Sequence, residues 1–409
     1  MNQEKSSSVA EKLPYVPPTE RLTQKGPEGI RFDFNDGARI TLPPRKSGTW
    51  RVTLRDDQTD NILFRSEVPQ GTVLSSKKYF VNFSFQIEVI EDDKSSRLVF
   101  EHVLDLKGQN VVVQLPVGTL GDTLGWFPYV ARFANQHKAK LTCILSPVFI
   151  PLFEKNYPHI IFKDIETAKA EKILEKTYAN YCIGLFFQDT DFIKQPTDFR
   201  MVGLHRTAGY ILGVDPSEER PNIFLEDTTR PIDEPYVCIA VQASTQCKYW
   251  NNPYGWRDVV AFLKERGYRV FCIDKEPIFG SGLTWNYMPY GAEDQTGNLP
   301  LTERARWLKH ASFFIGGSSG LAWLAWAMST QVLMISGFTH PLNEFNTPYR
   351  VINWHTCNSC WNDPTIQFDH KDFLWCPRHA GTARQFECTR LISSQQVMNT
   401  IEKLIAKTA

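Results

Sequence analysis

The chain has 409 residues, of which 42% are hydrophobic, and its 45 Lys and Arg residues balance 45 Asp and Glu residues. This length predicts two or three domains, and the zero net charge argues against nucleic-acid binding. Because residues 1–14 have no apolar core and no stretch approaches about 18 apolar residues, we expect neither a signal peptide nor a membrane span, and therefore a cytoplasmic protein.

The N-terminal quarter of the chain contains two kinds of sequence. Residues 1–28 are polar and contain prolines, which predicts a loose N-terminal arm. Residues 29–104 alternate polar and apolar side chains in short segments that are rich in β-branched and aromatic residues. This pattern predicts a small antiparallel β domain of about five to seven strands. Nothing in it suggests chemistry, so a scaffold or assembly role is the default interpretation.

Alternating strand and helix signals over residues 105–216 predict a Rossmann-like α/β domain. The short apolar runs that predict its strands are 110–116, 140–146, 159–165 and 181–187. The segments that predict its helices are 123–137, 147–158 and 166–176. A linker rich in proline and charge follows at 217–234.

A second α/β series occupies residues 235–409. Its predicted strands are 235–244, 268–274, 312–317 and 330–336, and its predicted helices are 255–267, 301–311, 320–329 and 393–407. Two Rossmann-like domains with a cleft between them are typical of the GT-B fold. The predicted fold class is therefore α/β, with a GT-B-type pair of Rossmann-like domains behind a small antiparallel β domain.

A glycine-containing segment separates the first predicted α/β strand from the helix that follows it. It reads Gly118, Thr119, Leu120, Gly121 and Asp122. Glycine lets the backbone turn tightly and approach a ligand, and open α/β sheets bind ligands at the carboxyl ends of their strands. Asp122 is therefore a candidate for chemistry, although the sequence alone slightly favours a plain helix cap. The segment lacks the G-x-G-x-x-G pattern, which argues against a dinucleotide cofactor.

Lys248 lies in the loop after the first strand of the second α/β series, within Q-C-K-Y-W at 246–250. A lysine there can face the cleft and neutralise a diphosphate. The alternative is a solvated surface lysine, which its position alone makes equally plausible.

Small residues fill 316–320, between a predicted strand and the next helix. Backbone N–H groups at such a helix start can bind an anion with the help of the helix dipole. The candidate contacts are Ser318, Ser319 and Gly320. The alternative is a tight turn that needs small residues. Trp323, on the helix, is expected in the core, and stacking on a base is the weaker hypothesis.

Four cysteines, the first two in a C-x-x-C motif, lie close together near the end of the chain. They are Cys357, Cys360, Cys376 and Cys388. Four thiolates can surround one metal ion, so we predict a metal finger at 354–390 that holds zinc or a single iron. A nearby histidine could replace one thiolate. A redox-active C-x-x-C is the main alternative, but such motifs open a helix, and W-N-D-P follows here.

In their order, these motifs resemble those of the bacterial autotransporter heptosyltransferases, which are relatives of the lipopolysaccharide heptosyltransferases. The matching motifs are G-T-L-G-D at 118–122, Q-C-K-Y-W at 246–250, G-G-S-S-G at 316–320 and the four cysteines. The resemblance covers nearly the whole chain. The lipopolysaccharide relatives have a phosphate loop closer to D-T/S-G-x-x-H, where this chain has Ser318 and Trp323. This departure favours the protein-modifying branch.

The resemblance implies transfer of heptose from ADP-heptose to serine hydroxyls of an autotransporter adhesin, in a single inverting displacement. Asp122 would be the general base, Lys248 would hold the diphosphate, and segments 118–121 and 318–320 would contact substrate. The family also implies one iron ion in the finger, with zinc as the alternative, no catalytic divalent ion, and a dodecameric ring. A lipopolysaccharide-core heptosyltransferase and a non-catalytic scaffold with a nucleotide-binding fold remain as alternatives.

Overall fold

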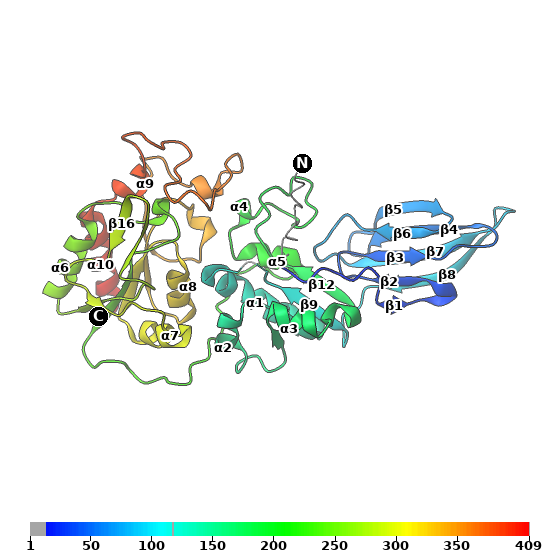
Figure 1. Ribbon diagram of the computed structural model, residues 1–409, viewed down its shortest axis with the longest axis horizontal. Helices are drawn as coiled ribbons and strands as arrows, with labels where there is room; N and C mark the ends of the chain where they lie inside the picture. Colours follow the sequence, from blue (N-terminus) through cyan, green and yellow to red (C-terminus); the bar gives the residue numbers. More distant parts are fainter. Residues whose placement is uncertain (1–13, 117, 409) are drawn as a thin grey trace, which may run out of the picture. The chain divides into compact units, whose positions relative to one another are not determined.

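The computed structural model describes residues 14–116 and 118–408, and Figure 1 labels its elements. The chain divides into two compact units. Among the described residues, the first unit contains 14–116, 138–146 and 162–184, and the second contains 118–137, 147–161 and 185–408. The first unit continues past residue 105, where the sequence analysis expected a domain limit. The expected domain limits remain predictions.

Two antiparallel four-stranded sheets form the β-rich part of the first unit, and they run in the orders β1-β2-β3-β6 and β5-β4-β7-β8. The strands of the first sheet are Gln24–Lys25, Arg31–Asp33, Arg39–Leu42 and Gly71–Leu74. Those of the second sheet are Asn61–Val68, Thr49–Asp56, Phe83–Ile90 and Ser96–Val103. Seven of these strands, β2 to β8, lie within residues 29–104, in agreement with the five to seven strands expected there, and β1 lies just before that range.

The inward faces of the two sheets form a shared aromatic core. The Phe32 and Phe85 ring centroids lie 5.5 Å apart in an edge-on arrangement, and the Phe34 and Phe83 rings stack at 6.1 Å. A buried ion pair completes this region, with Arg39 Nε 2.7 Å from Asp33 Oδ1. The period-two pattern thus identified the β domain correctly, and the core positions follow from it.

The prediction of a loose arm is wrong for the part of it that is described, residues 14–28. Val16 and Leu22 are buried. The Val16 N–H donates to Gln114 Oε1 at 2.8 Å, and Gln114 Nε2 donates to the Val16 carbonyl at 2.9 Å. A distant buried glutamine therefore orders a segment whose composition suggested disorder. The earlier part of the predicted arm lies outside the described residues.

A four-stranded sheet in the order β11-β10-β9-β12 contains all four strands predicted for the first α/β series. Their bounds are Ile161–Lys163, Lys140–Ile144, Asn110–Gln114 and Ala179–Cys182, and β9 runs parallel to both β10 and β12. The Phe34 N–H donates to the Tyr178 carbonyl at 2.8 Å, which joins the β-rich part to this sheet. The helix expected at 166–176 is broken at Lys172, whose φ of 51° is left-handed, into α3 (Ile165–Ala170) and a 3-10 turn (Ile173–Lys176).

The second unit is built on a six-stranded parallel sheet in the order β17-β14-β13-β18-β19-β20. The strands are Glu293–Asp294, Arg269–Cys272, Tyr236–Ala240, Phe313–Gly316, Val332–Ile335 and Tyr349–Val351. The four inner strands are those that the sequence predicts. The two edge strands were missed because they have only two and three residues.

Helices cover both faces of this sheet (Figure 1). On one face, α6 (Gly255–Glu265) and α10 (Ser394–Thr408) share a buried core with alternate residues of β13. On the other face lie α7 (Leu301–His310) and α8 (Gly320–Ala327), and the Tyr236 hydroxyl donates to the Trp307 carbonyl at 2.7 Å. Both faces of a parallel sheet must be covered, which is why its strands read as continuous apolar runs.

Among its described residues, the second unit contains five more α-helices and a hairpin. The helices are α1 (Leu120–His137), α2 (Ile150–Phe153), α4 (Phe199–Val202), α5 (Arg206–Leu212) and α9 (Glu387–Arg390), and a hairpin joins β15 (Ile278–Ser281) to β16 (Thr284–Tyr287). Within the segment predicted as a helix at 147–158, only a short 3-10 turn and α2 form.

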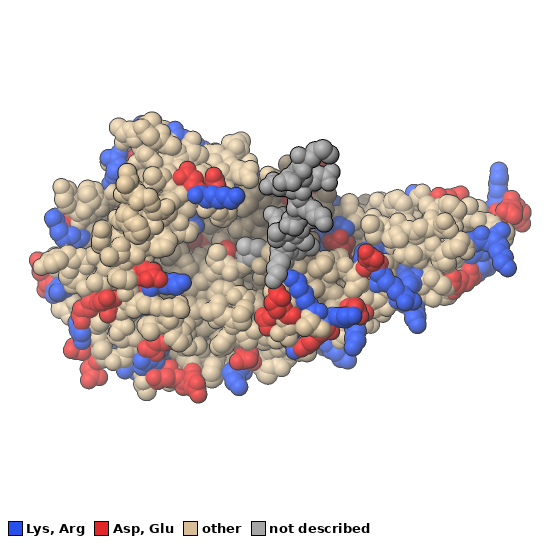
Figure 2. Space-filling view, in the orientation of Figure 1, with Lys and Arg blue, Asp and Glu red and all other residues tan. Residues whose placement is uncertain are grey.

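Basic and acidic side chains are interspersed on the face shown in Figure 2, as the balanced composition suggests. Among the helices of the described residues, none is both long and apolar enough to cross a membrane.

Candidate active site

The two predicted loops that begin helices α1 and α8 lie against each other. A Cβ atom on Gly121 would lie 2.8 Å from Trp323 Cδ1, and one on Gly320 would lie 2.8 Å from Leu120 Cβ. Any larger side chain at either glycine would therefore separate the two helix starts. The structure thus brings together two motifs that are far apart in the sequence.

Trp323 packs as a core residue against the glycine-lined face of α1. Its side chain is only 2% exposed, and its ring contacts the Phe345 ring at 5.0 Å and the His205 ring at 5.5 Å. A Cβ on Gly125 would lie 3.2 Å from its indole. This packing matches the core position that the sequence favoured for Trp323, and it offers no support for stacking on a base.

Asp122 lies in the first turn of α1 and is buried. Its Oδ2 accepts hydrogen bonds from the Thr119 N–H at 3.2 Å and from Thr119 Oγ1 at 2.9 Å, an arrangement that resembles one half of a capping box. Its Oδ1 accepts no hydrogen bond from the described part of the chain. Burial raises the pKa of Asp122, although the Thr119 hydrogen bonds and the Lys248 charge oppose that rise.

Lys248 lies in the 3-10 turn Gln246–Lys248 that follows β13, and it is only partly exposed. Its Nζ donates to Ser244 Oγ at 3.4 Å. Burial lowers the pKa of Lys248, while the neighbouring Cys247, Asp122 and Glu344 oppose that effect. Lys248 and Asp122 are therefore close enough for each to shift the pKa of the other, and Lys248 is not a fully solvated surface lysine.

The glycine- and serine-rich loop reaches the Lys248 turn. A Cβ on Gly317 would lie 2.9 Å from the Lys248 carbonyl oxygen. Ser319 immediately precedes α8, and its side chain does not cap the helix. The first N–H groups of a helix have no intrahelical partner, so this end of α8 can donate hydrogen bonds to an anion.

Sequence reasoning missed the buried Glu344 and its partly buried partner Arg350, which support the same loop. Ser318 Oγ donates to Glu344 Oε1 at 2.6 Å, and Arg350 Nη1 lies 2.9 Å from Glu344 Oε2. Glu344 is 2% exposed, so the ion pair and the serine satisfy a carboxylate that has left water. No local pattern marks Glu344, because its partners come from other segments.

A second missed residue, Glu218, lies in the predicted linker. Its carboxylate accepts hydrogen bonds from the Asn346 N–H at 2.8 Å and from Trp326 Nε1 at 3.3 Å. The buried His205 Nε2 lies 3.6 Å from the same side chain. One end of the linker is therefore attached to the helix that carries Trp323.

The four cysteines lie in one irregular segment, but the described residues contain no group of three or more His, Cys, Asp or Glu side chains arranged to hold a metal. Arg378 Nη1 lies 3.8 Å from Cys357 Sγ and 4.0 Å from Cys360 Sγ. Burial and the Cys357 thiol raise the pKa of Cys360 to about 12. Burial, followed by Cys360, also raises the pKa of Cys388. The thiols interact electrostatically, and coordination by all four is not confirmed.

The aromatic residues of the finger segment, residues 354–390, share a buried core with residues from outside that segment. The buried residues of this cluster are Phe199, Cys247, Phe338, Trp361, Phe368 and Trp375. Because Cys247 precedes Lys248, the cluster reaches the turn that carries the candidate lysine. The Gln246 N–H also donates to the Phe373 carbonyl at 2.8 Å. The finger therefore supports the loop that holds Lys248.

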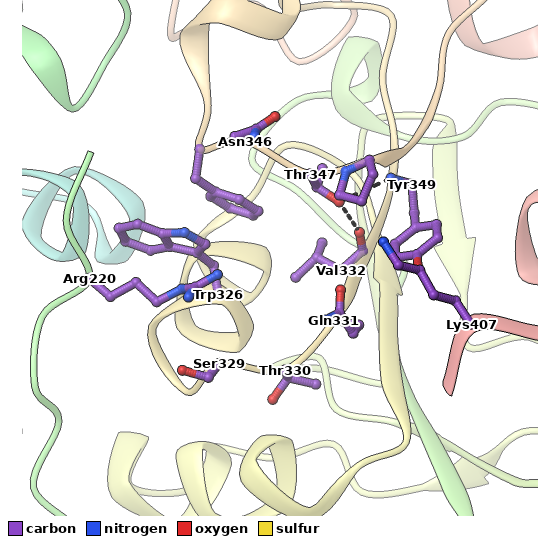
Figure 3. Close-up of a pocket in the computed structure, with 12 residues that line it drawn as sticks. Arg220, Trp326, Ser329, Thr330, Gln331, Val332, Asn346, Thr347, Tyr349 and Lys407 are labelled. Atoms are coloured by element: carbon purple, nitrogen blue, oxygen red, sulfur yellow. Dashed lines mark hydrogen bonds between the residues drawn. The ribbon is translucent and has the colours of Figure 1, made fainter. Parts of the chain in front are cut away.

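A cavity of about 340 Å³ lies at the amino ends of β19 and β20 (Figure 3). Arg220 and Lys407 contribute its cations, and Arg220 lies 5.7 Å from the Trp326 ring. The other lining residues are Ser329, Thr330, Gln331, Val332, Phe345, Asn346, Thr347, Pro348 and Tyr349. None of the predicted site residues lines this cavity, which lies at the opposite end of α8 from Gly320.

Comparison with known proteins identifies the family. The N-terminal domain model of glycosyltransferase TibC matches residues 26–93, and the model of glycosyltransferase family 9 (heptosyltransferase) matches residues 212–371. The autotransporter heptosyltransferase BAHTCr of Citrobacter rodentium is 52% identical, over 96% of this chain and 93% of that protein. The chain belongs to the autotransporter heptosyltransferase family. TibC of Escherichia coli O78:H11 is also 52% identical, over 95% of this chain and 93% of its own length.

Solved structures of this family confirm the mixed α/β glycosyltransferase fold with its N-terminal β domain. The crystal structure of TibC, an iron-containing dodecameric glycosyltransferase, has a TM-score of 0.89 and 50% identity, and it covers 96% of this chain and 100% of TibC. A second TibC structure is a complex with ADP-D-beta-D-heptose. A family 9 glycosyltransferase from Veillonella parvula, with 15% identity and a TM-score of 0.50 over 74% of this chain and 99% of its own, shares the fold.

The predicted family and the predicted glycosyltransferase class are both confirmed. One relative differs in activity by its name: the inactive autotransporter heptosyltransferase BimC of Burkholderia thailandensis is 46% identical over 95% of this chain and 89% of that protein. Turnover is therefore the first property to measure for any individual member.

Proposed function

We propose that this autotransporter heptosyltransferase transfers heptose from ADP-heptose to serine hydroxyls of an autotransporter passenger domain. One observation carries the proposal: a buried carboxylate, a partly buried ammonium and the start of a helix converge at a single place. Asp122 and Lys248 influence each other's pKa, and Gly317 lies against the Lys248 carbonyl. A base, a cation and an anion site at such close range are the groups that a glycosyl transfer from a nucleotide sugar needs.

Asp122 acts as the general base. Thr119 holds one of its carboxylate oxygens, which leaves Oδ1 to accept the serine proton. The serine oxygen forms a bond to the anomeric carbon from one side while the bond to the β-phosphate oxygen breaks on the other, so the configuration inverts. The raised pKa of Asp122 brings the carboxylate closer to the working pH, where a general base is most effective.

Lys248 and the start of α8 stabilise the departing ADP. The ammonium neutralises charge that develops on the diphosphate, and the α8 dipole adds to this effect. Because Ser318 Oγ is committed to Glu344, the phosphate contacts come mainly from the backbone at Ser319 and Gly320. Segment 118–121 lines the acceptor side of the reacting atoms. A catalytic divalent cation is unnecessary in this arrangement.

One iron ion is held by Cys357, Cys360, Cys376 and Cys388, with zinc as the alternative metal. The donor set has the right chemistry, because thiolates are ligands that iron and zinc accept, and a bound cation would stabilise the Cys360 thiolate, whose formation burial and Cys357 oppose. The metal supplies a cross-link between loops and takes no part in the transfer. The iron reported for TibC supports this choice.

The protein forms a homo-oligomer and functions in the cytoplasm. The TibC dodecamer supports a ring of this size, and thiolate ligands persist in a reducing compartment. The two α/β series form a GT-B pair, with domain limits at 29–104, 105–216 and 235–409.

Intact-mass analysis of a passenger domain incubated with this protein and ADP-heptose tests the proposal. The expected result is a ladder of heptose additions that stops when Asp122 is replaced by Ala. Consumption of ADP-heptose only with a lipid-core acceptor would favour the lipopolysaccharide enzyme. No turnover on either acceptor would favour a scaffold, the state that the name of BimC suggests.

A binding measurement tests the donor side separately. Lys248→Ala is expected to weaken ADP binding about tenfold in calorimetry, because a partly desolvated charge pair with a phosphate is lost. An unchanged affinity would remove Lys248 from the site and leave the role of Asp122 intact.

A further inference from the structure

We infer that Phe338, Trp361 and Phe368 form an aromatic cage that holds the Lys248 ammonium and directs its N–H groups toward the diphosphate. This inference rests on the proposed function of Lys248 and extends it to three positioning residues. Two of them, Trp361 and Phe368, belong to the finger segment. The inference therefore gives the aromatic residues of the finger a part in donor binding.

The cage is defined by its distances. Lys248 Nζ lies over all three rings, 5.3 Å from the Phe338 centroid, 5.8 Å from that of Trp361 and 5.4 Å from that of Phe368. A cation within about 6 Å of a ring centroid is attracted by the negative face of the ring. All three rings meet this distance criterion.

The rings also hold one another in place. The Phe338–Trp361, Phe338–Phe368 and Trp361–Phe368 centroids are 5.4, 5.5 and 5.3 Å apart, so the three rings form a closed triangle. All three side chains are buried, and Trp361 Nε1 donates to Asn343 Oδ1 at 3.0 Å. The cage is therefore a rigid support rather than a set of mobile side chains.

An aromatic cage suits an ammonium that must bind phosphate. A carboxylate partner would neutralise the charge and occupy the N–H donors, whereas ring faces stabilise the charge and leave those donors available. Among the described residues, Ser244 Oγ is the one hydrogen-bond acceptor at Lys248 Nζ, at 3.4 Å. Burial opposes the charged form of Lys248, and the ring faces offset part of that cost.

A fluorination series tests the cage. Phenylalanine at position 368 is replaced by its mono-, di- and trifluorinated analogues, which reduce the negative charge of the ring face with little change in size. We expect the Kd for ADP to rise stepwise by about three- to tenfold in total. The same series at Phe386, which packs against the same cluster without being one of the three rings, is the control and should leave the Kd unchanged.

A double-mutant cycle separates failure of the cage from failure of the proposed function. In the free protein, fluorination at 368 should shift the unfolding equilibrium several-fold more with Lys248 present than in Lys248→Met. Equal shifts in the two backgrounds, or a flat ADP affinity across the series at 368, would overturn the inference. If ADP affinity is unchanged in Lys248→Met itself, the proposed role of Lys248 fails, and the coupling in the free protein still reports on the cage.

Discussion

Asp33 in the first compact unit and Asp122 in the second are both buried, but their surroundings are opposite. Asp33 in the β-rich part pairs directly with Arg39 at 2.7 and 2.8 Å and also accepts from the Thr23 N–H. Within the described residues, Asp122 accepts two hydrogen bonds, both from Thr119, and it influences Lys248 without a direct ion pair. A carboxylate with complete partners stabilises a fold, whereas one that keeps a free oxygen and a raised pKa can take part in chemistry.

Among the changes that test this contrast, replacement of Asp122 should have the largest effect, and the effect should be on activity. Asp122→Asn keeps an oxygen that can accept from Thr119 but cannot take the serine proton at neutral pH. Heptose transfer should fall by a factor of about 10² to 10⁴, while the thermal unfolding midpoint changes little. The measurement is the initial rate of mass addition to the passenger domain. Normal turnover in this variant would assign the base to another residue.

Replacement of Asp33 should instead lower the stability of the fold and leave ligand binding by the folded protein unchanged. Asp33→Ala leaves the buried Arg39 guanidinium without its partner, and we expect a loss of about 3–5 kcal/mol in the free energy of unfolding. The folded fraction should retain its ADP affinity. Denaturant titration measures the loss, and Glu67→Ala is the matched control, because the exposed pair Arg51–Glu67 contributes at most about 1 kcal/mol. Similar losses of unfolding free energy in Asp33→Ala and Glu67→Ala would show that the buried Asp33–Arg39 pair stabilises the fold no more than an exposed pair does.

The glycine contact between α1 and α8 should be sensitive to a single methyl group. In Gly121→Ala the new Cβ would meet the Trp323 indole at 2.8 Å, so we expect a destabilisation of about 1–3 kcal/mol from overpacking. ADP binding should weaken as well, because the start of α8 is displaced. Calorimetry on this variant and on Gly121→Ala combined with Trp323→Phe checks the cause, since the smaller ring should restore part of the affinity.

The pH dependence of heptose transfer should show whether Asp122 and Lys248 titrate in the active site. The raised pKa of Asp122 means that activity falls on acidification before an ordinary aspartate would be protonated. The lowered pKa of Lys248 means that activity falls on the basic side before an ordinary lysine would lose its charge. The kcat/KM profile should therefore be a narrow bell. Lys248→Arg should abolish the basic limb, since arginine keeps its charge, and a profile that keeps this limb would assign it to another group.

The raised pKa of Asp122 should affect stability in the opposite direction to activity: acidification lowers the rate of transfer but increases this group's contribution to stability. Because its pKa is raised in the folded state, the folded protein binds more protons than the unfolded chain between the two pKa values. Stability from this group is therefore gained as pH falls through the folded-state pKa and is lost as pH rises through it. The difference in unfolding free energy between the wild type and Asp122→Asn, measured from neutral to acidic pH, should show this trend.

The sequence predicted those elements whose signal is local and long. The inner strands β13, β14, β18 and β19 are continuous apolar runs, and the helix α6 ends close to Gly267, as its pattern indicated. The edge strands β17 and β20 were not predictable, because two or three residues carry no period. The arm at 14–28 was misjudged because its order depends on Gln114, a residue from another segment.

The candidate site shows the same difference between residues with a local sequence signal and residues that depend on distant neighbours. Glycine spacing and strand–helix boundaries were enough to name Asp122, Lys248 and the loop at 316–320 as candidates, since these motifs lie where parallel strands end, but they did not separate a functional Asp122 or Lys248 from a helix cap or a surface lysine. Glu344, Arg350 and the three rings around Lys248 could not be selected in this way. Each is an ordinary residue by itself and acquires a role only from its neighbours in space.

The sequence by itself determined the family, the β and α/β segments and the positions of the motifs, because these depend on residue type, spacing and local periodicity. Only the tertiary structure decided that Trp323 packs against the glycine-lined face of α1, that the two helix starts are in contact, and that Phe338 and two aromatic residues of the finger surround a lysine. The physical reason is that burial, close packing and charge–ring contacts join residues far apart along the chain, and no local pattern records which of them will meet.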